Sequence, residues 1–153
     1  MINTELISYN IIIIDDSNIT VKLMCYLFKD SPKINNTMTA SDGLDAINKI
    51  YNNINKIDIV FTDNEMPNLN GKDVTKLLRS INFNKLIIGI TDSINNELSE
   101  FYLCGIDYLF TKPINKKKID LILNFLNKND ITRYPNKTLK LINDELVWID
   151  NIH

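Results

Sequence analysis

Short apolar runs alternate with longer amphipathic segments through most of the chain. Apolar runs rich in β-branched residues occupy residues 9–14, 57–62, 86–90 and 108–111, and a more polar segment at residues 36–40 is expected to form a further short strand. Most of them lack an alternation of polar and apolar positions, which is typical of strands buried on both faces of a parallel sheet. In the segments between them, apolar residues recur every three or four positions and predict helices. The pattern therefore predicts five βα pairs.

Each predicted helix has one apolar stripe that we expect to face the sheet. Ser17, Asp92 or Ser93, and Asn115 are suited to cap helix starts, and Gly105 is suited to end the fourth helix. The stripes consist of Thr20, Leu23, Met24, Leu27 and Phe28; Leu44, Ile47, Ile50, Tyr51 and Ile54; Val74, Leu77, Leu78 and Ile81; Ile94, Leu98, Phe101 and Tyr102; and Ile119, Ile122, Phe125 and Leu126.

Alternating strands and helices predict an α/β fold with a doubly wound, five-stranded parallel sheet. A flavodoxin-like strand order of 2-1-3-4-5 places the ligand crevice at the carboxyl ends of the first and third strands. Asp15 and Asp16 close the first strand and Asp63 closes the third. Thr91 follows the fourth strand and Lys112 the fifth, so these polar residues are expected at one edge of the sheet.

Composition narrows the classes of protein that the chain can belong to. With 153 residues and a formal net charge of −2, we expect one main domain and no nucleic-acid partner. The longest apolar run, residues 11–14, is too short to span a membrane, and the chain start lacks the features of a signal peptide. We therefore expect a cytoplasmic protein without a membrane partner.

Several kinds of catalytic or binding site are excluded by the residues that would form them. His153 is the sole histidine and Cys25 and Cys104 are the two cysteines, which excludes a usual zinc site and histidine-based catalysis. Both cysteines are expected to be reduced thiols in the core. The four glycines are too far apart to form a phosphate-binding loop.

The acidic residues at the strand ends predict a metal-assisted phosphoryl-transfer site. Carboxylates within about 4 Å of one another repel by roughly 4 kcal/mol per pair at an effective dielectric constant of 20. Asp15, Asp16 and Asp63 would therefore stay ionised together only around a cation, and Mg²⁺ or Mn²⁺ suits oxygen ligands. Lys112 would provide positive charge to phosphoryl oxygens, and Thr91 a hydrogen bond.

Each of these residues also has an ordinary structural explanation. Acidic residues and Thr91 commonly cap helices, and Lys112 before a proline is common in turns. Their joint placement at four strand ends is not needed for folding, and this favours a functional site.

The chain resembles the receiver domain of two-component response regulators over about residues 8–129. The resemblance is carried by Ile11-Ile12-Ile13-Ile14-Asp15-Asp16-Ser17, Thr39-Ala40-Ser41-Asp42-Gly43, Asp63-Asn64-Glu65-Met66-Pro67 with Gly71, Ile90-Thr91, and Thr111-Lys112-Pro113-Ile114.

The resemblance implies that Asp63 accepts a phosphoryl group from a histidine kinase or a histidine phosphotransfer protein, in a two-component system or phosphorelay. It implies that Mg²⁺ is held by Asp15, Asp16, Asp63 and the backbone carbonyl of Glu65. Such a protein is not a conventional enzyme, although it catalyses its own phosphorylation and dephosphorylation. A homodimer through the face formed by the fourth helix, fifth strand and fifth helix is also expected, with an output partner that the sequence does not identify.

Conformational switching in the family involves Thr91 and the position three residues before Lys112, which is usually aromatic. Here that position is Leu109, and the aromatic Tyr108 precedes it, where strand alternation points it to the opposite face. Weak or altered coupling is therefore expected. Asp92, where the family usually has a small residue, would either cap a helix or tune the rates of phosphorylation and hydrolysis.

Residues 130–153 are expected to form a short extension of a receiver domain at residues 1–129, without a separate output domain. Leu139, Ile142, Leu146 and Ile149 suit a helix, whereas two strands about Asn143-Asp144 are equally compatible with the periodicity. Trp148 is expected to pack on the domain or on a partner.

Three alternatives to a switching receiver share part of this sequence pattern. An interaction module that has lost switching would share every motif except the aromatic one. A phosphatase with a phospho-aspartate intermediate usually has an Asp-x-Asp pair after its first strand, whereas Asp15 and Asp16 are adjacent. A flavin-binding protein of flavodoxin type would need a phosphate-binding loop at the same place.

Overall fold

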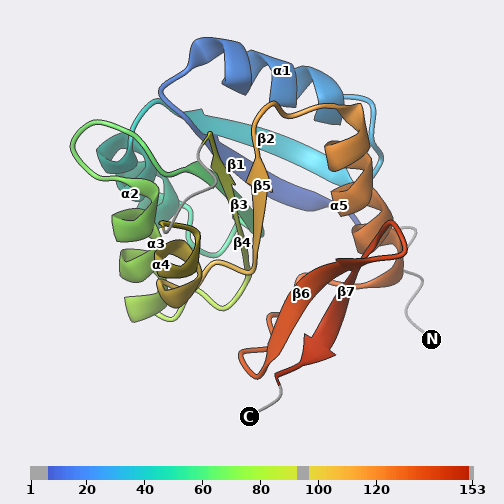
Figure 1. The fold of residues 1–153 in the computed structure, drawn as a ribbon. Helices are drawn as coiled ribbons and strands as arrows, with labels where there is room; N and C mark the ends of the chain where they lie inside the picture. Colours follow the sequence, from blue (N-terminus) through green and yellow to red (C-terminus); the bar gives the residue numbers. More distant parts are fainter. Residues whose placement is uncertain (1–6, 93–96, 152–153) are drawn as a thin grey trace.

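The computed structural model describes residues 7–92 and 97–151, apart from the side chains of residues 97–99. Five strands form one parallel sheet in the order β2-β1-β3-β4-β5, so the expected doubly wound fold is confirmed (Figure 1). The elements of this α/β unit are β1 (Tyr9–Ile14), α1 (Asn18–Phe28), β2 (Ile34–Ala40), α2 (Gly43–Asn52), β3 (Ile59–Asp63), α3 (Gly71–Ser80), β4 (Leu86–Thr91), α4 (Glu97–Leu103), β5 (Tyr108–Thr111) and α5 (Lys116–Lys128).

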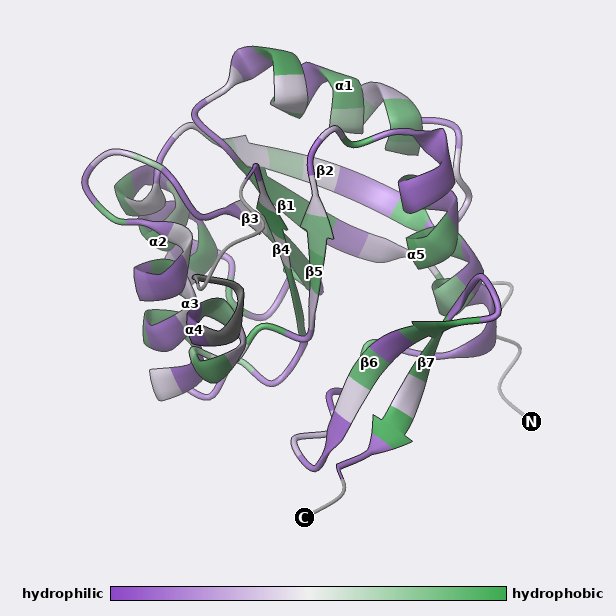
Figure 2. Ribbon diagram, in the orientation of Figure 1, coloured by the Kyte–Doolittle hydropathy of each residue, from purple (hydrophilic) through white to green (hydrophobic). Residues whose placement is uncertain are grey.

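Two apolar clusters lie on opposite faces of the sheet. Ile11 and Ile13 of β1 face α1 and α5, whereas Ile12 and Ile14 face α2, α3 and α4. The alternation follows from the strand geometry, in which successive side chains point to opposite faces. Figure 2 shows the central strands as mainly hydrophobic and the outer helix surfaces as mixed. Burial on both faces explains why β1 reads as a continuous apolar run.

Helix starts follow the capping preferences of the sequence. Ser17 and Asn115 cap α1 and α5, as expected, because their side-chain oxygens accept hydrogen bonds from the backbone N–H groups three residues later. Asp42 and Asn70 cap α2 and α3 in the same way. The expected cap at Ser93 lies outside the described residues, and so does Ile94.

The apolar stripes predicted for the helices are too wide. Leu23 of α1, Leu44 and Tyr51 of α2, and Leu77 and Ile81 at α3 and its end are exposed. Each of these helices lies on the sheet with one narrow face, formed in α2 by Ala46 and Ile50, so the apolar residues at the sides of the helix remain in water. Periodicity gives the direction of a helix face but not its width.

Strand boundaries differ from the prediction by one or two residues. β2 begins at Ile34 rather than at residue 36, and β3 covers Ile59–Asp63 rather than residues 57–62. β4 extends through Thr91 because Thr91 pairs with Thr111 of β5.

Residues beyond α5 form a two-stranded antiparallel hairpin, β6 (Lys137–Ile142) and β7 (Glu145–Asp150). Its turn residues, Asn143 and Asp144, both have positive φ, at 51° and 60°. Asn and Asp tolerate this left-handed conformation, which two-residue hairpin turns require. The strand alternative for this segment is therefore the one that the chain adopts.

The hairpin packs against α5 and lies beside β5 (Figure 1). Leu139 and Leu146 are buried in the cluster under α5. Trp148 packs its ring on Phe125 and Tyr134, with ring centroids 6.4 and 5.5 Å away. Packing of Trp148 on the domain is therefore what the structure shows.

A buried carboxylate connects the extension with the sheet. Asp107, just before β5, contacts Arg79 at the end of α3 and Arg133 after α5, with N–O distances of 3.0 and 2.9 Å. It also accepts a hydrogen bond from the backbone N–H of Ile87 in β4. Burial raises the pKa of Asp107, and both guanidinium groups act against this rise.

The two cysteines are free thiols, but both are only partly buried. The prediction of free thiols is correct, but the prediction of full burial in the core is wrong, because Cys25 lies at the side of α1 and Cys104 follows the end of α4. In the described part of the chain, no helix combines the length and the apolar character needed to cross a bilayer.

Candidate functional site

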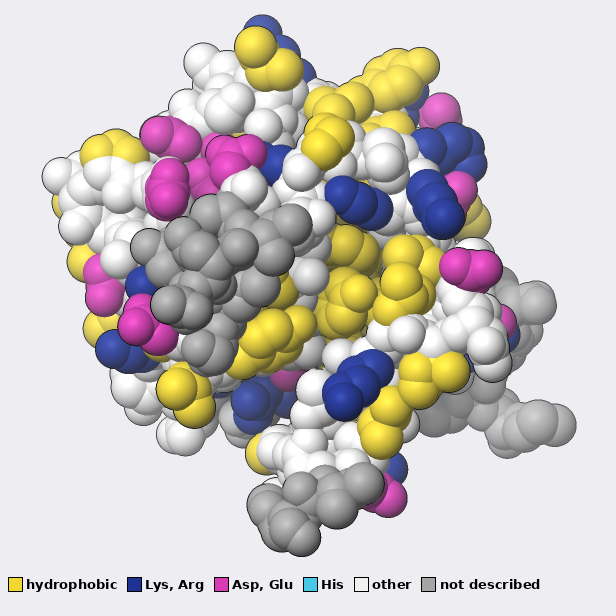
Figure 3. All heavy atoms as spheres, viewed as in Figure 1, with side chains coloured by type: hydrophobic (Ala, Val, Ile, Leu, Met, Phe, Trp, Pro, Cys, Tyr) yellow, Lys and Arg dark blue, Asp and Glu magenta, His cyan; other side chains and the backbone are white. Residues whose placement is uncertain are grey.

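Three carboxylates meet at the carboxyl ends of β1 and β3. Asp15, Asp16 and Asp63 each offer an oxygen atom, and these oxygens all lie within 4.8 Å of one another. Asp15 and Asp63 are buried, whereas Asp16 is exposed. β1 and β3 are neighbours in the sheet, so the chain brings residues 48 positions apart into one cluster. Acidic side chains gather at this end of the sheet in Figure 3.

The two carboxylate oxygens of Asp15 have different partners. Its Oδ1 accepts a hydrogen bond of 2.8 Å from the backbone N–H of Ser17. Its Oδ2 is buried without a hydrogen bond from the described residues, and its near neighbour is Nζ of Lys112 at 2.9 Å, an ion-pair contact. A buried carboxylate oxygen whose partner among the described residues is one ammonium group can also contact a hard cation, which prefers oxygen ligands.

Asp63 ends β3, and the loop after it requires a glycine at Gly71. A Cβ added at Gly71 would lie 2.2 Å from the carbonyl oxygen of Asp63, so any larger residue would displace the loop. The hydroxyl of Thr62 donates to the same carbonyl at 2.9 Å, and the backbone N–H of Gly71 donates to the carbonyl of Asn64 at 2.9 Å. The start of α3 is thus packed directly against the phosphoacceptor candidate.

The surroundings of Asp63 favour its neutral form in the protein alone. Burial is the largest cause and the negative charge of Asp15 the second, and together they raise the pKa of Asp63 to about 7 in spite of the positive charge of Lys112. A cation near the three carboxylates would reverse this effect and favour the ionised, nucleophilic form.

Lys112 places a positive charge between the carboxylates of Asp15 and Asp63. Its Nζ lies 2.9 Å from Oδ2 of Asp15 and 3.6 Å from Oδ2 of Asp63. Burial lowers the pKa of Lys112, but these carboxylates and Asp92 more than compensate, and the pKa lies above its ordinary value. The Lys112–Pro113 peptide bond is cis, and the backbone N–H of Lys112 donates to the carbonyl of Thr91 at 2.8 Å.

Thr91 is buried at the end of β4, opposite Thr111 of β5. Glu65 and Asp92 are exposed near the carboxylate cluster, one after β3 and the other after β4. Asp92 precedes α4, whose first described residue is Glu97. The structure therefore brings Asp15, Asp16, Asp63 and Lys112 together, with Thr91 at the neighbouring strand end.

The two residues before Phe110 lie on opposite faces of β5. Leu109 packs with Phe101 and Ile106 on the α4 side, in space left by Gly89, where an added Cβ would lie 2.7 Å from Leu109 Cδ1. Tyr108 packs edge-on against Phe110 on the other face, at 4.9 Å between ring centroids.

Two side chains near the site were not identified in the sequence. Lys118 donates from Nζ to the carbonyls of Thr111 and Pro113, and so supports the loop that carries Lys112. The hydroxyl of Tyr102 in α4 accepts a hydrogen bond of 3.1 Å from the backbone N–H of Leu109. Neither contact had a sequence signal, because one lysine among three and one tyrosine of an apolar stripe resemble ordinary surface residues.

Comparison with known proteins identifies one family over most of the chain. The model of the response regulator receiver domain matches residues 11–124. The stress response regulator protein 1 of Candida tropicalis is 34% identical over 122 residues, which are 77% of this chain and 45% of that protein. The two-component response regulator ARR22 of Arabidopsis thaliana is 28% identical over 119 residues, covering 76% of this chain and 82% of that protein.

Solved structures show the same fold. A chain in the crystal structure of a CheX-CheY-BeF3-Mg²⁺ complex from Borrelia burgdorferi is 27% identical, with a TM-score of 0.70, and the match covers 81% of this chain and 96% of that one. The receiver domain of the Francisella response regulator 1452 is also 27% identical, with a TM-score of 0.66, covering 79% and 98%.

The chain spans less than half the length of several curated relatives, including the Candida tropicalis protein. The common part is the α/β unit that carries the carboxylate cluster. Fold, carboxylate cluster and family match agree, and the chain belongs to the response regulator receiver domain family.

Proposed function

We propose that the chain is a phosphoacceptor receiver in which Asp63 accepts a phosphoryl group from a phosphohistidine. The observation that carries this proposal is the position of the Asp63 carboxylate, which ends a buried strand beside Asp15 and Asp16 and lies 3.6 Å from the Lys112 ammonium. In the transfer, the P–N bond of the donor breaks, a P–O bond to Asp63 forms, and the electron pair of the broken bond remains on the imidazole.

Mg²⁺ is the cofactor that the cluster suits best, and Mn²⁺ would be similar. Asp15, Asp16 and Asp63 would hold it, together with the backbone carbonyl of Glu65. The three carboxylate oxygens within 4.8 Å of one another, two of them on buried residues, support this assignment. A bound divalent cation neutralises carboxylate charge and stabilises charge on the transferring group.

Two residues complete the proposed site. Lys112 pairs with a phosphoryl oxygen once that group occupies Asp63, because its ammonium already lies between the two buried carboxylates. The hydroxyl of Thr91, at the end of the neighbouring strand, hydrogen-bonds the same group and so reports its presence to β4.

A protein donor is favoured by the exposed surface of α1. Ile19, Leu23 and Tyr26 are exposed at helical spacing, with Ile19 82% exposed at the end of the helix nearest Asp15 and Asp16. This apolar stripe beside the carboxylates suits a helix of a histidine kinase or a histidine phosphotransfer protein. The donor would then meet this chain in the cytoplasm.

The output of phosphorylation is proposed to be binding to a partner. Leu109 occupies the position that is usually aromatic, so coupling between Asp63 and the α4–β5 surface would be weaker than in most receivers. An interaction module that has lost this coupling is the second candidate. A homodimer through α4, β5 and α5 would have to accommodate the hairpin, which packs on α5 and beside β5.

The decisive experiment is phosphorylation with acetyl phosphate and Mg²⁺, followed by intact-mass measurement. Wild type should gain one phosphoryl group, and Asp63→Asn and wild type with excess chelator should gain none. The switching receiver and the interaction module are separated by oligomer size and partner binding with beryllofluoride. Labelling that persists in Asp63→Asn would refute the assignment of the acceptor.

A second experiment tests the protein donor separately. Ile19→Asp should slow transfer from a phosphorylated histidine phosphotransfer protein by about tenfold or more, because it introduces a charge into an apolar contact. Labelling by acetyl phosphate, which needs no docking surface, should keep its wild-type rate. If both rates fall together, the change acts on the site rather than on docking.

A further inference from the structure

Thr62 is a polar residue in the buried strand that ends at Asp63. It is fully buried and follows the apolar residues Val60 and Phe61 in β3. A buried hydroxyl without a hydrogen bond destabilises a fold, so valine, which has nearly the same shape, would be the simpler residue here. The Thr62 hydroxyl avoids this cost because it donates a hydrogen bond of 2.9 Å to the carbonyl oxygen of Asp63.

The Asp63 carbonyl belongs to the rigid peptide unit that joins Asp63 to Asn64. The carbonyl and the N–H of a trans peptide unit lie in one plane and point in opposite directions, so a bond that holds the carbonyl also directs the N–H. Burial and the charge of Asp15 raise the pKa of Asp63, whereas Lys112 and a hydrogen bond from the backbone N–H of Asn64 lower it. The Thr62 hydroxyl is thus linked, through one peptide unit, to the carboxylate of Asp63.

The start of α3 lies against the same peptide unit. Side chains alternate along β3, and Val60 belongs to the apolar cluster under α3, so Thr62 points to that face as well. The backbone N–H of Gly71 donates to the Asn64 carbonyl at 2.9 Å, and a Cβ added at Gly71 would lie 2.2 Å from the Asp63 carbonyl oxygen. The peptide unit is therefore enclosed between the Thr62 hydroxyl and the first residue of α3.

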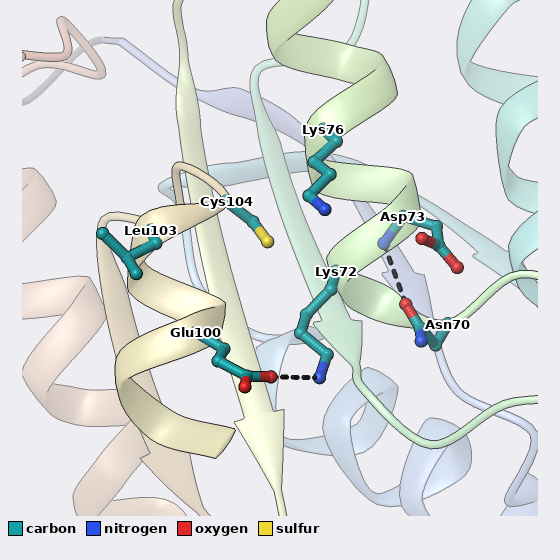
Figure 4. A pocket seen from close by; sticks show the side chains of 7 residues that line it. All are labelled: Asn70, Lys72, Asp73, Lys76, Glu100, Leu103 and Cys104. Atoms are coloured by element: carbon teal, nitrogen blue, oxygen red, sulfur yellow. Dashed lines mark hydrogen bonds and ion pairs between the residues drawn. The ribbon is translucent and has the colours of Figure 1, made fainter. Parts of the chain in front are cut away.

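Contacts of its own fix the start of α3. Figure 4 shows two of them: Asn70 accepts a hydrogen bond of 2.8 Å from the backbone N–H of Asp73, and Lys72 forms an ion pair of 3.1 Å with Glu100 of α4. Because these contacts do not involve Thr62, loss of the Thr62 hydroxyl should release the Asp63 carbonyl and leave α3 in place.

We propose that Thr62 is a positioning residue for phosphoryl transfer to Asp63, and that it acts by holding the Asp63–Asn64 peptide unit. The hydroxyl orients the stretch of backbone that carries the Asp63 carboxylate and the Glu65 carbonyl, both of which are assigned to Mg²⁺. The inference rests on the proposed phosphoacceptor function and adds to it a residue outside the carboxylate cluster.

The first measurement is the rate of labelling by acetyl phosphate at varied donor concentration. Thr62→Val removes the hydroxyl and should lower the maximal rate about tenfold or more, because small displacements of reacting groups are costly. The donor concentration that gives half the maximal rate should stay within about twofold of the wild-type value, since no contact with the donor is lost. Thr62→Ser keeps the hydroxyl and should recover most of the rate.

The second measurement is Mg²⁺ binding to the unphosphorylated protein by titration calorimetry, which does not depend on the reaction. Thr62→Val should bind Mg²⁺ about tenfold more weakly than wild type, as is typical when a residue that orients metal ligands is lost. Thr62→Ser should bind it with nearly wild-type affinity. Thr62→Ala is a second variant without the hydroxyl and should show the same two losses as Thr62→Val.

Thr75→Val is the matched control. Thr75 is also fully buried, and its hydroxyl donates to a backbone carbonyl, that of Gly71, at 2.7 Å. The substitution removes the same group from the same face of the sheet but leaves the Asp63–Asn64 peptide unit untouched. Its labelling rate and Mg²⁺ affinity should stay within about twofold of wild type. Melting temperatures show that each variant is folded.

Three results would overturn the proposal: equal losses in Thr62→Val and Thr75→Val, wild-type rate and affinity in Thr62→Val, or losses that Thr62→Ser does not recover. Failure of the phosphoacceptor function looks different, because wild type itself would then gain no phosphoryl group. In that case the Mg²⁺ affinities of the variants still decide whether Thr62 positions the backbone.

Discussion

Among single residues, Asp63 is the one whose ionisation gives the stability of the protein its clearest dependence on pH. Its pKa of about 7 lies above the ordinary value of a carboxyl group, so the folded protein binds this proton more tightly than the unfolded chain does. The free energy of unfolding of the metal-free protein therefore increases as the pH falls from about 7 toward 4. Above pH 7, the ionised Asp63 beside Asp15 destabilises the fold.

Asp63→Asn should consequently stabilise the metal-free protein at pH 8 and have little effect at pH 5. We expect an increase in melting temperature of roughly 4 °C at pH 8, about 1 kcal/mol after solvent screening of the charge is allowed for. Melting curves recorded in chelator at both pH values check this. An equal increase at pH 5 would mean that charge repulsion is not the cause.

Lys118 is expected to position Lys112 rather than to contact the phosphoryl group. Lys118→Met removes the donor to the carbonyls of Thr111 and Pro113 and should slow labelling by acetyl phosphate about tenfold, because small displacements of a catalytic group are costly. Lys118→Arg should restore part of the rate. Lys117→Met is the matched control, since Lys117 makes no described contact with this loop.

If Lys118→Met lowers the melting temperature without slowing the labelling, Lys118 is a structural residue only. The pH dependence of the labelling rate gives a further distinction, because a displaced Lys112 would alter the ionisation of Asp63.

At the scale of elements, the hairpin depends on its turn. Asn143 and Asp144 both occupy the left-handed region, where a β-branched residue is strained. Asn143→Val should destabilise the hairpin by about 1 kcal/mol, and Asp144→Gly should stabilise it by roughly 0.5 kcal/mol. Trp148 is the sole tryptophan, so its fluorescence reports undocking of the hairpin during thermal unfolding.

Asn36→Val is the control for this prediction, because Asn36 is exposed in β2 with ordinary backbone angles. A similar loss in both variants would indicate a general effect of valine on stability rather than strain in the turn.

The sequence predicts the strands more accurately than the helix faces. The inner strands are predicted to within one or two residues because burial on both faces leaves a continuous apolar run, as in β1. The edge strand β2 is partly exposed and has no such run. Helix faces were predicted too widely, because Leu44 and Tyr51 follow the same period as Ile50 but lie to the side of the contact with the sheet. The hairpin was ambiguous, because Leu139 and Leu146 fit both periods.

In the complete fold, the acidic residues of the site were predictable from the sequence, but the side chains that hold the neighbouring loop and strand in place were not. Asp15, Asp63 and Lys112 end predicted strands, and the order of the sheet brings strand ends together. The contacts of Lys118 and Tyr102 depend on how α4 and α5 lie on the sheet, which no local pattern specifies. The division into a receiver at residues 1–129 and an extension at residues 130–153 stays a prediction.

Removal of residues 130–153 tests that division. The shortened chain should still accept a phosphoryl group, because the carboxylate cluster and Lys112 lie in residues 15–112. It should lose roughly 3 kcal/mol or more of unfolding free energy, since Leu139 and Leu146 leave the core. Intact-mass labelling and denaturant unfolding measure the two quantities. Loss of labelling in a folded, shortened chain would contradict the division.

The contacts of Asp107 limit the substitutions that relatives with a comparable hairpin can tolerate. Its carboxylate is shared by Arg79 in the receiver unit and Arg133 in the extension, and it is buried. A chain that lost Arg133 would keep a buried negative charge with one cation instead of two, and a chain that lost Asp107 would keep two facing guanidinium groups. Among relatives with a comparable hairpin, residues 107 and 133 should therefore change together. A sequence alignment would show this covariation and so identify which relatives share the extension.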